Sequence, residues 1–299
     1  MTGSDFSKLI KTRLTVLVTF SASISFIIAV KQANKQGVDT WGLLYSSTMW
    51  INWLKLVVGG FLVTSAANCF NEVIEVKYDK LMKRTMDRPM PAGRMTTGQG
   101  LVLGMAMGII GTYLLGSLNL LTGLLSVFSI LLYAFAYTPL KRVNAIAVFV
   151  GAIPGALPAL IGYVAGQPHG RIDQIAIILF LIQFVWQFVH FWAIAWVLDD
   201  DYKLAGFRLL PTGERDKTSA VVTFIFAVIL VPVSLLPTIY GYGGYYVGGV
   251  SLVMSLLFLY QAFGLLRTLE IKAARTLMFG SFYWLPVVQL MFLFDFIGK

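Results

Sequence analysis

Long uncharged stretches constrain the fold of this chain more than any other feature. Several windows of about 18 to 22 residues contain no charged side chain, and a helix of about 20 apolar residues spans the roughly 30 Å hydrocarbon core of a bilayer. Hydrophobic residues make up 58% of the chain and charged residues only 12%, which excludes an ordinary soluble domain. The sequence therefore predicts an all-α, polytopic membrane protein.

Nine membrane spans can be placed in residues 1–299, which we expect to form a single integral-membrane domain. Their predicted centres lie near residues 22, 60, 108, 128, 155, 186, 229, 254 and 288. Only the short segment from Gly116 to Asn119 separates the third span from the fourth. Because a single helix covering both would be far too long for a bilayer, a tight hairpin is expected there.

Basic residues are distributed unevenly between the two ends of these spans. Of 23 lysines and arginines, 18 fall on one side and four on the other, with Lys55 inside the second span. Cytoplasmic loops are rich in Lys and Arg, so we expect a cytoplasmic N-terminus and an external C-terminus. On this interpretation Lys141 and Arg142 are topological anchors, and the net charge of +9 indicates no nucleic-acid partner.

The N-terminal segment shows neither a cleavage site nor an Arg-rich amphipathic presequence. We therefore expect no removed leader, and a prokaryotic plasma (inner) membrane as the location.

Charge is concentrated in residues 71–94, NEVIEVKYDKLMKRTMDRPMPAGR, after the second span. Asn71, Glu75 and Asp79 recur every four residues, so on a helix they share one face at steps of roughly 6 Å. Like charges at this spacing disfavour a free helix by a few tenths of a kcal/mol, whereas Mg²⁺ binds such oxygens together with a substrate phosphate. The alternative is a solvated helix end with salt bridges to Lys80, Lys83 and Arg84.

A basic cluster follows these acidic residues and includes Arg84, Arg88 and Arg94. Guanidinium groups bind phosphate in a bidentate manner, so the acidic and basic groups together are typical of a diphosphate site. The alternative is ordinary positive-inside charge. Pro89 and Pro91 should stop the preceding helix before this cluster ends.

A second acidic cluster, Asp199 to Asp201, ends the sixth span on the same predicted side of the membrane. If spans two and six approach one another, their carboxylates could hold Mg²⁺ against a diphosphate, above an apolar lumen.

The sixth span is also rich in aromatic residues, including Trp186, and carries His190 at membrane depth. Such a histidine can ligate haem iron, hydrogen-bond a substrate or bond a neighbouring helix, and the last is commonest.

Four separated segments carry a resemblance to a known family. They are the acidic motif with LMKRTMDRPMPAGR, then YTPLKRVNAIAVFVGAIPGALPALIGY, HFWAIAWVLDDDYKLAGFRLLP and ARTLMFGSFYWLPVV. From about Lys11 to Asp295, in colinear order, the chain resembles the UbiA-type intramembrane prenyltransferases, and among them the protohaem IX farnesyltransferases (haem O synthases). The resemblance implies a nine-helix fold around a central cavity that opens to the cytoplasmic face.

The resemblance also implies the reaction partners: farnesyl diphosphate and haem b as substrates within the lipid membrane, Mg²⁺ as cofactor, and a haem A synthase as partner. The site residues it implies are, for catalysis, Asn71, Asp79 and Asp201; for the metal, Asn71, Glu75, Asp79, Asp200 and Asp201; for the diphosphate, Arg84, Arg88 and Lys203; and for a haem contact, His190 and Trp186.

Three positions in two motifs depart from the family pattern. The first motif is commonly N-x₃-D-x₃-D, so Glu75 is longer by one methylene group, and its reach could shift the ion. Phe188 and Val189 stand where a proline pair often precedes the motif histidine, which changes the expected local helix geometry.

The chemistry that follows is electrophilic alkylation. Mg²⁺ and basic side chains would stabilise charge on the leaving diphosphate while the allylic C–O bond ionises, and aromatic walls would stabilise the carbocation. A haem vinyl group would then attack carbon one of the farnesyl chain, and water would complete a hydroxyethylfarnesyl side chain.

Two alternatives stay open. One is a prenyltransferase of the same fold acting on a quinone precursor such as 4-hydroxybenzoate. The other is a transporter or haem-handling protein, although the matched broken-helix repeats that are typical of transporters are only weakly visible in this sequence.

Overall fold

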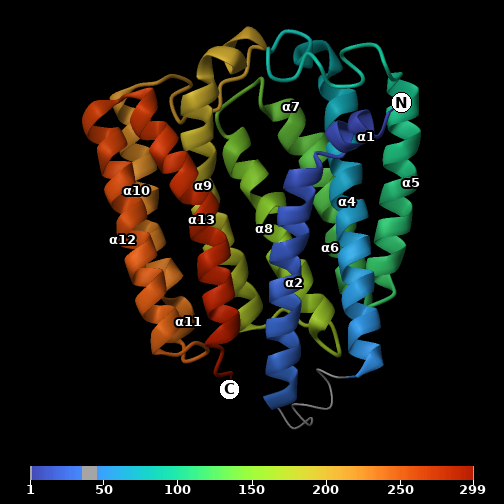
Figure 1. Ribbon diagram of the computed structural model, residues 1–299, viewed down its shortest axis with the longest axis vertical. Coiled ribbons are helices and arrows are strands. Elements are labelled where there is room, and N and C mark those ends of the chain that lie inside the picture. Colours follow the sequence, from blue (N-terminus) through green and yellow to red (C-terminus); the bar gives the residue numbers. More distant parts are fainter. Residues whose placement is uncertain (1, 36–45, 299) are drawn as a thin grey trace.

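Long helices running side by side make up most of the computed structural model (Figure 1), which describes residues 2–35 and 46–298. In these ranges nine segments are long and apolar enough to cross a membrane, which confirms the predicted all-α class and number of spans. They are α2 (Thr12–Lys35), α4 (Ser47–Asp79), α5 (Thr97–Gly116), α6 (Leu120–Leu131) with η1 (Leu132–Tyr137) and α7 (Thr138–Leu140), α8 (Ala147–Gly166), α9 (Gln174–Leu204), α10 (Lys217–Ser234) with α11 (Leu236–Ile239), α12 (Tyr245–Thr268) and α13 (Ile271–Phe294).

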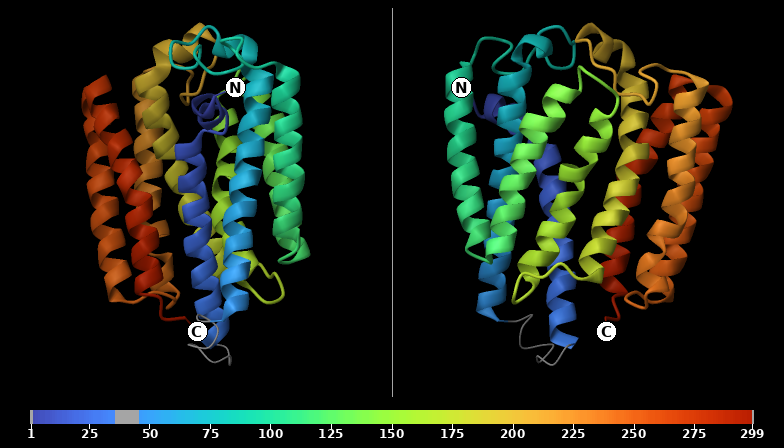
Figure 2. Two further views of the ribbon diagram at one scale, coloured as in Figure 1. Left: turned by 45° about the vertical axis from the view of Figure 1, so that its right-hand side comes forward. Right: turned by 180° about the vertical axis from the view of Figure 1, so that it is seen from behind.

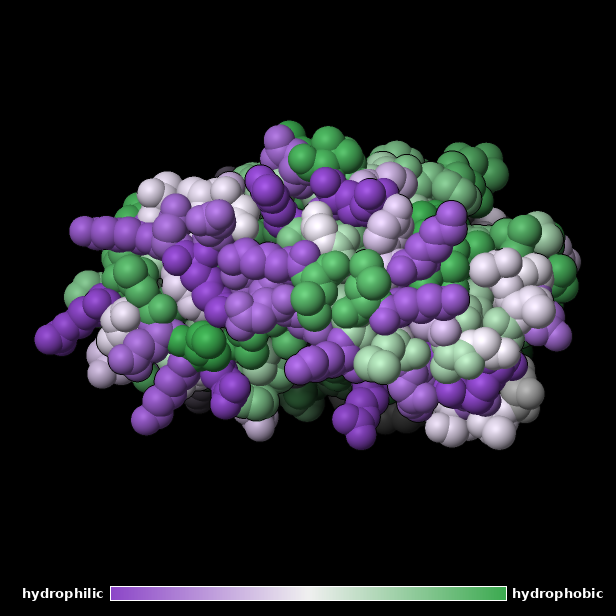
Figure 3. All heavy atoms as spheres, turned by 90° about the horizontal axis from the view of Figure 1, so that it is seen from above, coloured by the Kyte–Doolittle hydropathy of each residue, from purple (hydrophilic) through white to green (hydrophobic). Residues whose placement is uncertain are grey.

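The two termini lie at opposite ends of the bundle (Figure 1), as an odd number of spans requires. The short helix α1 (Gly3–Leu9) lies across the same end as the loops after α4 and α9, and the view from behind shows these loops together (Figure 2). Figure 3 shows this end from above, with hydrophilic side chains spread over it. We call it the charged end; that it faces the cytoplasm stays a prediction.

Helices α4 and α9 are the longest, with 33 and 31 residues. At a rise of about 1.5 Å per residue they measure about 50 and 46 Å, well beyond a hydrocarbon core of roughly 30 Å. Their C-terminal turns can therefore carry acidic side chains outside the apolar layer. Helix α4 ends at Asp79, and the segment containing Pro89 and Pro91 forms turns.

Ion pairs fasten α1 to the loop that follows α4. Arg94 Nε lies 2.8 Å from Asp5 Oδ1, and Lys8 Nζ lies 2.5 Å from Asp87 Oδ2. The Thr2 hydroxyl accepts a hydrogen bond from the backbone N–H of Asp5 and so caps the helix. These contacts hold the junction of α1 and α2, where Lys11 lies, at the charged end.

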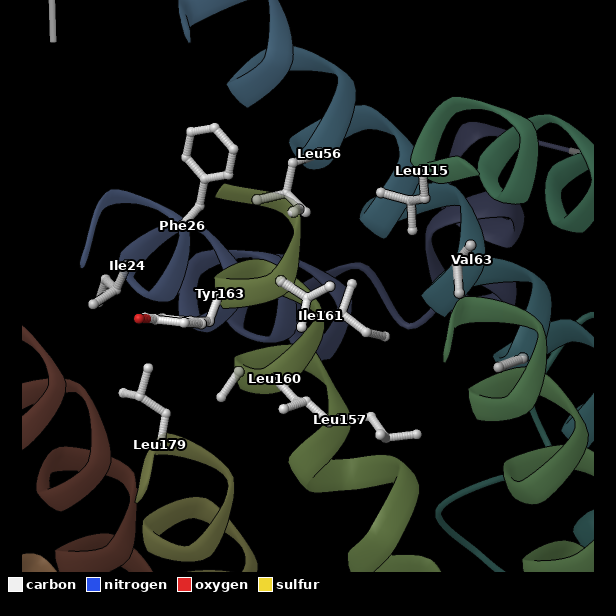
Figure 4. Packing of buried hydrophobic residues seen from close by; sticks show 14 of the residues in the cluster. Ile24, Phe26, Leu56, Val63, Leu115, Leu157, Leu160, Ile161, Tyr163 and Leu179 are labelled. Carbon is white, nitrogen blue, oxygen red and sulfur yellow. The ribbon is translucent and has the colours of Figure 1, made fainter. Parts of the chain in front are cut away.

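Small residues let α8 pack closely against α2. A Cβ atom built on Gly162 would lie 2.0 Å from the backbone oxygen of Ala22, so only glycine fits at this crossing. Around it, apolar side chains of α8 such as Leu157 and Ile161 extend toward Leu56 of α4 (Figure 4). Glycine at such crossings allows backbones to approach within a membrane.

Candidate functional site

A cavity of about 540 Å³ extends into the bundle from the charged end. Its walls come from α2, α4, η1, α8, α9 and α13, with contributions from the segments after α4, α7 and α9. Acidic and basic side chains line the outer part, whereas apolar, aromatic and amide side chains line the inner part. The cavity can therefore receive a molecule with a charged head and an apolar body.

The oxygen-bearing side chains of α4 lie on the cavity side of that helix. Asn71, Glu75 and Asp79 all line the cavity, and each is at most 4% exposed. Asn71 is held in place by a hydrogen bond from its Nδ2 to the Thr138 hydroxyl, at 3.0 Å. The fold therefore turns the predicted face of α4 inward, away from bulk water.

Lys11 reaches Asn71 from the junction of α1 and α2. Its Nζ donates to Asn71 Oδ1 at 2.7 Å, and its φ of 48° is a left-handed conformation that residues other than glycine seldom adopt. Burial, with Arg88 nearby, lowers the pKa of Lys11 to about 7. The sequence suggests only an anchor at this position, and the cavity contact arises from the fold.

Lys141 is not the surface anchor that its place after the fourth span suggested. It is 9% exposed, and its Nζ donates to Glu75 Oε1 at 2.8 Å. The same nitrogen lies 4.6 Å from the centre of the Tyr137 ring, a favourable cation–π position. Glu75, the longer residue of the first motif, therefore has a basic partner of its own.

Arg88 binds two buried carboxylates of α4. Its Nη1 lies 2.7 Å from Asp79 Oδ2, and its Nε lies 3.4 Å from Glu72 Oε1. Asp79 Oδ1 and both Glu72 oxygens are buried and have no hydrogen-bond partner among the described residues. Since unpaired buried carboxylate oxygens are costly, they favour a further cation or donor at this place.

The second acidic cluster does not reach the cavity. Asp199 is buried and lies 2.8 Å from Lys203 Nζ and 3.7 Å from Arg215 Nε. Asp200 lies 3.1 Å from Arg215 Nη1. Neither Asp200 nor Lys203 lines the cavity, so their predicted metal and diphosphate roles stay predictions that this arrangement does not support directly.

Asp201 holds the segment after α4 through its backbone. Its carboxylate accepts hydrogen bonds from the backbone N–H groups of Lys83, at 2.9 Å, and Arg84, at 3.4 Å. Arg84 itself lines the cavity and stacks 5.5 Å above the ring of Tyr202. In this structure Asp201 orients the backbone at Arg84, a residue predicted to bind the diphosphate. The catalytic and metal roles predicted for Asp201 itself stay predictions.

Asp201→Ala should therefore loosen this segment. A hydrogen bond to a charged group contributes about 1.5–3 kcal/mol, so we expect the amides of Lys83 and Arg84 to exchange hydrogen at least about tenfold faster, as measured by exchange with mass spectrometry. Asp200→Ala is the matched control and should leave both amides unchanged. Equal protection in both variants would contradict the role given to Asp201.

The acidic groups on α4 suit Mg²⁺ by their chemistry. Among the residues that the structure describes, no three His, Cys, Asp or Glu side chains surround a common metal position. However, the unpartnered oxygens of Glu72 and Asp79, with Asn71 and Glu75 beside them, are the hard donors that Mg²⁺ shares with phosphates. The α4 part of the predicted metal site therefore fits this ion.

A π-helical turn places two tyrosines in the cavity wall. Tyr133 and Tyr137 lie in η1 with ring centroids 5.4 Å apart, and both line the cavity. The Thr138 hydroxyl donates to the Tyr133 carbonyl at 2.8 Å, which satisfies one group of this irregular turn. Such turns occur often at functional sites, and here the turn adds aromatic faces beside the charged groups.

Deeper in the cavity lie Trp186 and His190, the two predicted haem contacts. Both line the cavity, and their rings stack with centroids 4.5 Å apart and 16° between the planes. His190 Nδ1 lies 2.7 Å from the Ser281 hydroxyl of α13. The structure therefore brings the histidine to the cavity and also gives it a neighbouring helix as partner.

Amide side chains, which sequence reasoning missed, form the inner end of the cavity. Ser21 donates to Gln183 Oε1 at 2.8 Å, and Gln289 Nε2 donates to Ser21 Oγ at 2.8 Å. Gln187 also lines this part of the cavity. A glutamine inside an apolar span is the signal that could have found them, because such residues usually face the bundle interior.

The cavity also reaches the outer surface of the bundle between α2 and α13, which lie side by side in Figure 1. Leu17, Phe20 and Phe282 line the cavity and are 59%, 38% and 44% exposed. In a bilayer this surface would meet lipid, so an apolar molecule could pass between membrane and cavity.

Comparison with known proteins agrees with this arrangement. Residues 40–285 match the UbiA prenyltransferase family. The chain is similar to the protoheme IX farnesyltransferase of Cytophaga hutchinsonii, with 42% identity over 292 residues that cover 97% of this chain and 96% of the relative. It is also similar to the protoheme IX farnesyltransferase of Flavobacterium johnsoniae, with 38% identity, 97% of this chain and 94% of the relative covered.

Solved structures share the fold at much lower identity. A structure described for the biosynthesis of digeranylgeranylglyceryl phosphate synthase in membranes has a TM-score of 0.78 at 19% identity, covering 98% of this chain and 97% of that chain. A UbiA homolog from Archaeoglobus fulgidus, bound to GPP and Mg²⁺, has a TM-score of 0.63 at 11% identity, covering 97% and 99%. At these identities the likeness shows a common fold.

Proposed function

This chain belongs to the UbiA prenyltransferase family, and from that premise we propose that it transfers a farnesyl group from farnesyl diphosphate to a vinyl group of haem b. The vinyl group attacks carbon one of the farnesyl chain as the bond to diphosphate breaks. Water then adds to the cationic carbon left on the former vinyl group and loses a proton, and the products are haem O and diphosphate. The observation that carries this proposal is the similarity, over nearly the whole chain, to protoheme IX farnesyltransferases. The cavity supports it, because its charged outer part and aromatic inner part suit an allylic diphosphate.

The charged groups at the cavity mouth comprise three carboxylates and four basic side chains. Glu72, Glu75 and Asp79 lie close to Lys11, Arg88 and Lys141, and Arg84 also lines the cavity. A diphosphate adds more negative charge than this small excess offsets, so its binding favours further positive charge at the same place. The relative bound to GPP and Mg²⁺ supports a divalent cation as its source.

We propose that Asn71, Glu75 and Asp79 hold Mg²⁺, with Glu72 beside them. When bound, the ion supplies charge stabilisation for the departing diphosphate. The basic side chains that now contact these oxygens would then be available to bind diphosphate oxygens, together with Arg84, which Asp201 orients through the backbone. Because these groups already lie at the cavity mouth, and Lys141 is buried there, they stabilise the developing charge with little reorganisation.

The inner cavity residues act on the organic part of the substrates. The rings of Tyr133 and Tyr137 line the cavity close to the charged groups, so they can present π faces to the allylic cation. The apolar walls keep water away from the allylic cation until the vinyl group has attacked it, and water is consumed only in the step that follows. The opening between α2 and α13 provides a path from the lipid for both apolar substrates.

The membrane location and the orientation of the chain are part of the same proposal. The chain is an integral membrane protein, and we place it in a prokaryotic plasma (inner) membrane with its charged end and N-terminus in the cytoplasm, on the support of the Lys and Arg distribution. A haem A synthase as partner stays a prediction.

Purified protein in lipid nanodiscs, given haem b, farnesyl diphosphate and Mg²⁺, should form haem O, detected by mass spectrometry. A parallel reaction with 4-hydroxybenzoate in place of haem b tests the quinone-precursor alternative, and we expect no product there. Product from 4-hydroxybenzoate but not from haem b would overturn the proposal. Transport of a substrate without any alkylated product would favour the transporter alternative.

Removal of the metal should stop the reaction. With EDTA in excess over Mg²⁺ we expect haem O formation to fall by at least about 10²-fold, because the diphosphate would leave without its main charge stabilisation. Addition of excess Mg²⁺ should restore the rate. Unchanged turnover in EDTA would show that the basic side chains suffice, and the Mg²⁺ assignment would be wrong.

A further inference from the structure

We propose that Ser281 of α13 is a positioning residue that fixes the tautomer of His190, so that the Nε2 lone pair of this histidine faces the cavity and ligates the iron of the porphyrin acceptor. The tautomer follows from hydrogen-bond geometry alone. The iron contact rests on the proposed function, since it requires that the acceptor be a haem.

The hydroxyl proton of Ser281 is already committed. Ser281 Oγ lies 2.5 Å from the backbone oxygen of Met278, and two oxygens approach this closely only with a proton between them. A serine hydroxyl has a single proton to donate. Ser281 therefore acts as the acceptor in its other hydrogen bond, the one with His190.

This hydrogen bond determines which nitrogen of His190 carries the proton. Nδ1 lies 2.7 Å from Ser281 Oγ, and because the serine accepts, Nδ1 must donate. In a neutral imidazole one nitrogen donates and the other has a free lone pair. The proton is therefore on Nδ1, and Nε2 is the bare nitrogen.

The side chain that carries the bare nitrogen lies in the cavity wall. His190 lines the cavity and is only partly buried, and no described residue forms a hydrogen bond with Nε2. It lies nine residues before Asp199 on α9, which is about 14 Å along the helix axis. A haem bound there would lie between the histidine and the charged end, where the allylic diphosphate is expected.

Neighbouring rings hold the imidazole in this orientation. Trp186 stacks on one face of His190, and the Trp186 Nε1–H donates to the Ser281 carbonyl at 3.1 Å. Phe282 approaches the ring with its centroid 5.5 Å away and 64° between the planes. A histidine that ligates a metal commonly donates a hydrogen bond from its other ring nitrogen to a neighbouring oxygen, and this bond fixes the tautomer and the ring orientation. For His190 that oxygen is Ser281 Oγ.

The tautomer can be measured without any activity. The chain has two histidines, His169 and His190, so ¹⁵N-histidine labelling of a His169→Gln variant in nanodiscs gives NMR signals from His190 alone. We expect a protonated Nδ1 and an unprotonated Nε2. Ser281→Thr, which keeps the hydroxyl, should give the same spectrum, whereas Ser281→Ala should give a mixture of tautomers.

Ser251→Ala is the matched control, because the Ser251 hydroxyl is buried on α12 and has no hydrogen-bond partner within residues 2–35 and 46–298. It should leave the spectrum of His190 unchanged. A protonated Nε2 in the reference protein, or a Ser281→Ala spectrum identical to it, would overturn the role of Ser281.

The iron contact is tested by titration with ferric haem, followed by absorption and electron paramagnetic resonance. We expect an axial histidine signature that His190→Ala abolishes. Ser281→Ala should weaken haem binding by about 10–100-fold, and Ser281→Thr should restore it. Haem binding without a histidine signature would overturn the iron contact while the NMR result stands, and intact ligation without haem O formation would overturn the proposed function alone.

Discussion

Asp79→Asn should lower kcat for farnesyl transfer by about 10²–10³-fold, a loss comparable with removal of one preorganised electrostatic group from an active site. Asp79 is fully buried and contacts Arg88 at 2.7 Å, and its other carboxylate oxygen has no hydrogen-bond partner in the part of the chain that the structure describes. Asparagine has nearly the same shape but removes the charge that would hold a metal ion and orient Arg88. Haem O formation under saturating substrates measures the effect.

The asparagine variant must also be shown to fold, because removing one partner of a buried ion pair destabilises proteins by about 3–5 kcal/mol. Thermal unfolding of the purified variant checks this, and activity is compared well below its midpoint. Asp200→Asn tests the metal role that the resemblance implies for this residue. Because Asp200 pairs with Arg215 outside the cavity, the structure favours a rate within about twofold of the reference, as for exposed ion pairs of little energetic weight. A severe loss in Asp200→Asn with normal rates in Asp79→Asn would reverse the assignment.

Gly162→Ala should destabilise the bundle by about 2–3 kcal/mol, at the upper end of typical overpacking effects. The added methyl group would lie 2.0 Å from the Ala22 backbone oxygen, so the α2 backbone must move away from α8. Because the contacted atom belongs to the backbone, no side-chain rotation can relieve the clash. Unfolding in mixed micelles of increasing SDS content measures the change in free energy.

Gly60→Ala provides the matched control for this helix glycine. Nothing lies within 4 Å of a Cβ built on Gly60, and alanine is favoured over glycine in helices by up to about 1 kcal/mol. We therefore expect neutral or slightly raised stability. If Gly162→Ala proved as stable as Gly60→Ala, the close approach of α2 and α8 would be wrong.

The helices were predictable because the signals for them are local. A span is recognised from about 20 neighbouring residues without charge. The hairpin at Gly116 to Asn119 follows from the thickness of a bilayer, which a single helix over both apolar runs would exceed. The shared face of Asn71, Glu75 and Asp79 also follows from helix geometry. These statements need no knowledge of which helices become neighbours.

The partners of these side chains could not be predicted in the same way. Lys11 and Asn71 are 60 residues apart, Glu75 and Lys141 are 66 apart, and Asp201 and Lys83 are 118 apart. In the sequence these lysines resemble ordinary cytoplasmic anchors. The aspartate resembles an ordinary member of an acidic metal cluster.

By itself, the sequence determined that this chain crosses a membrane as nine helices, and that acidic and basic groups gather at one end of the second and sixth spans. Hydrophobic length and helix periodicity decide both properties within a few turns of chain. Tertiary structure decided which carboxylates face the cavity, which cation each one meets and which helix supplies the partner of His190. Those outcomes depend on contacts between distant helices, where a shift of one turn would exchange one partner for another.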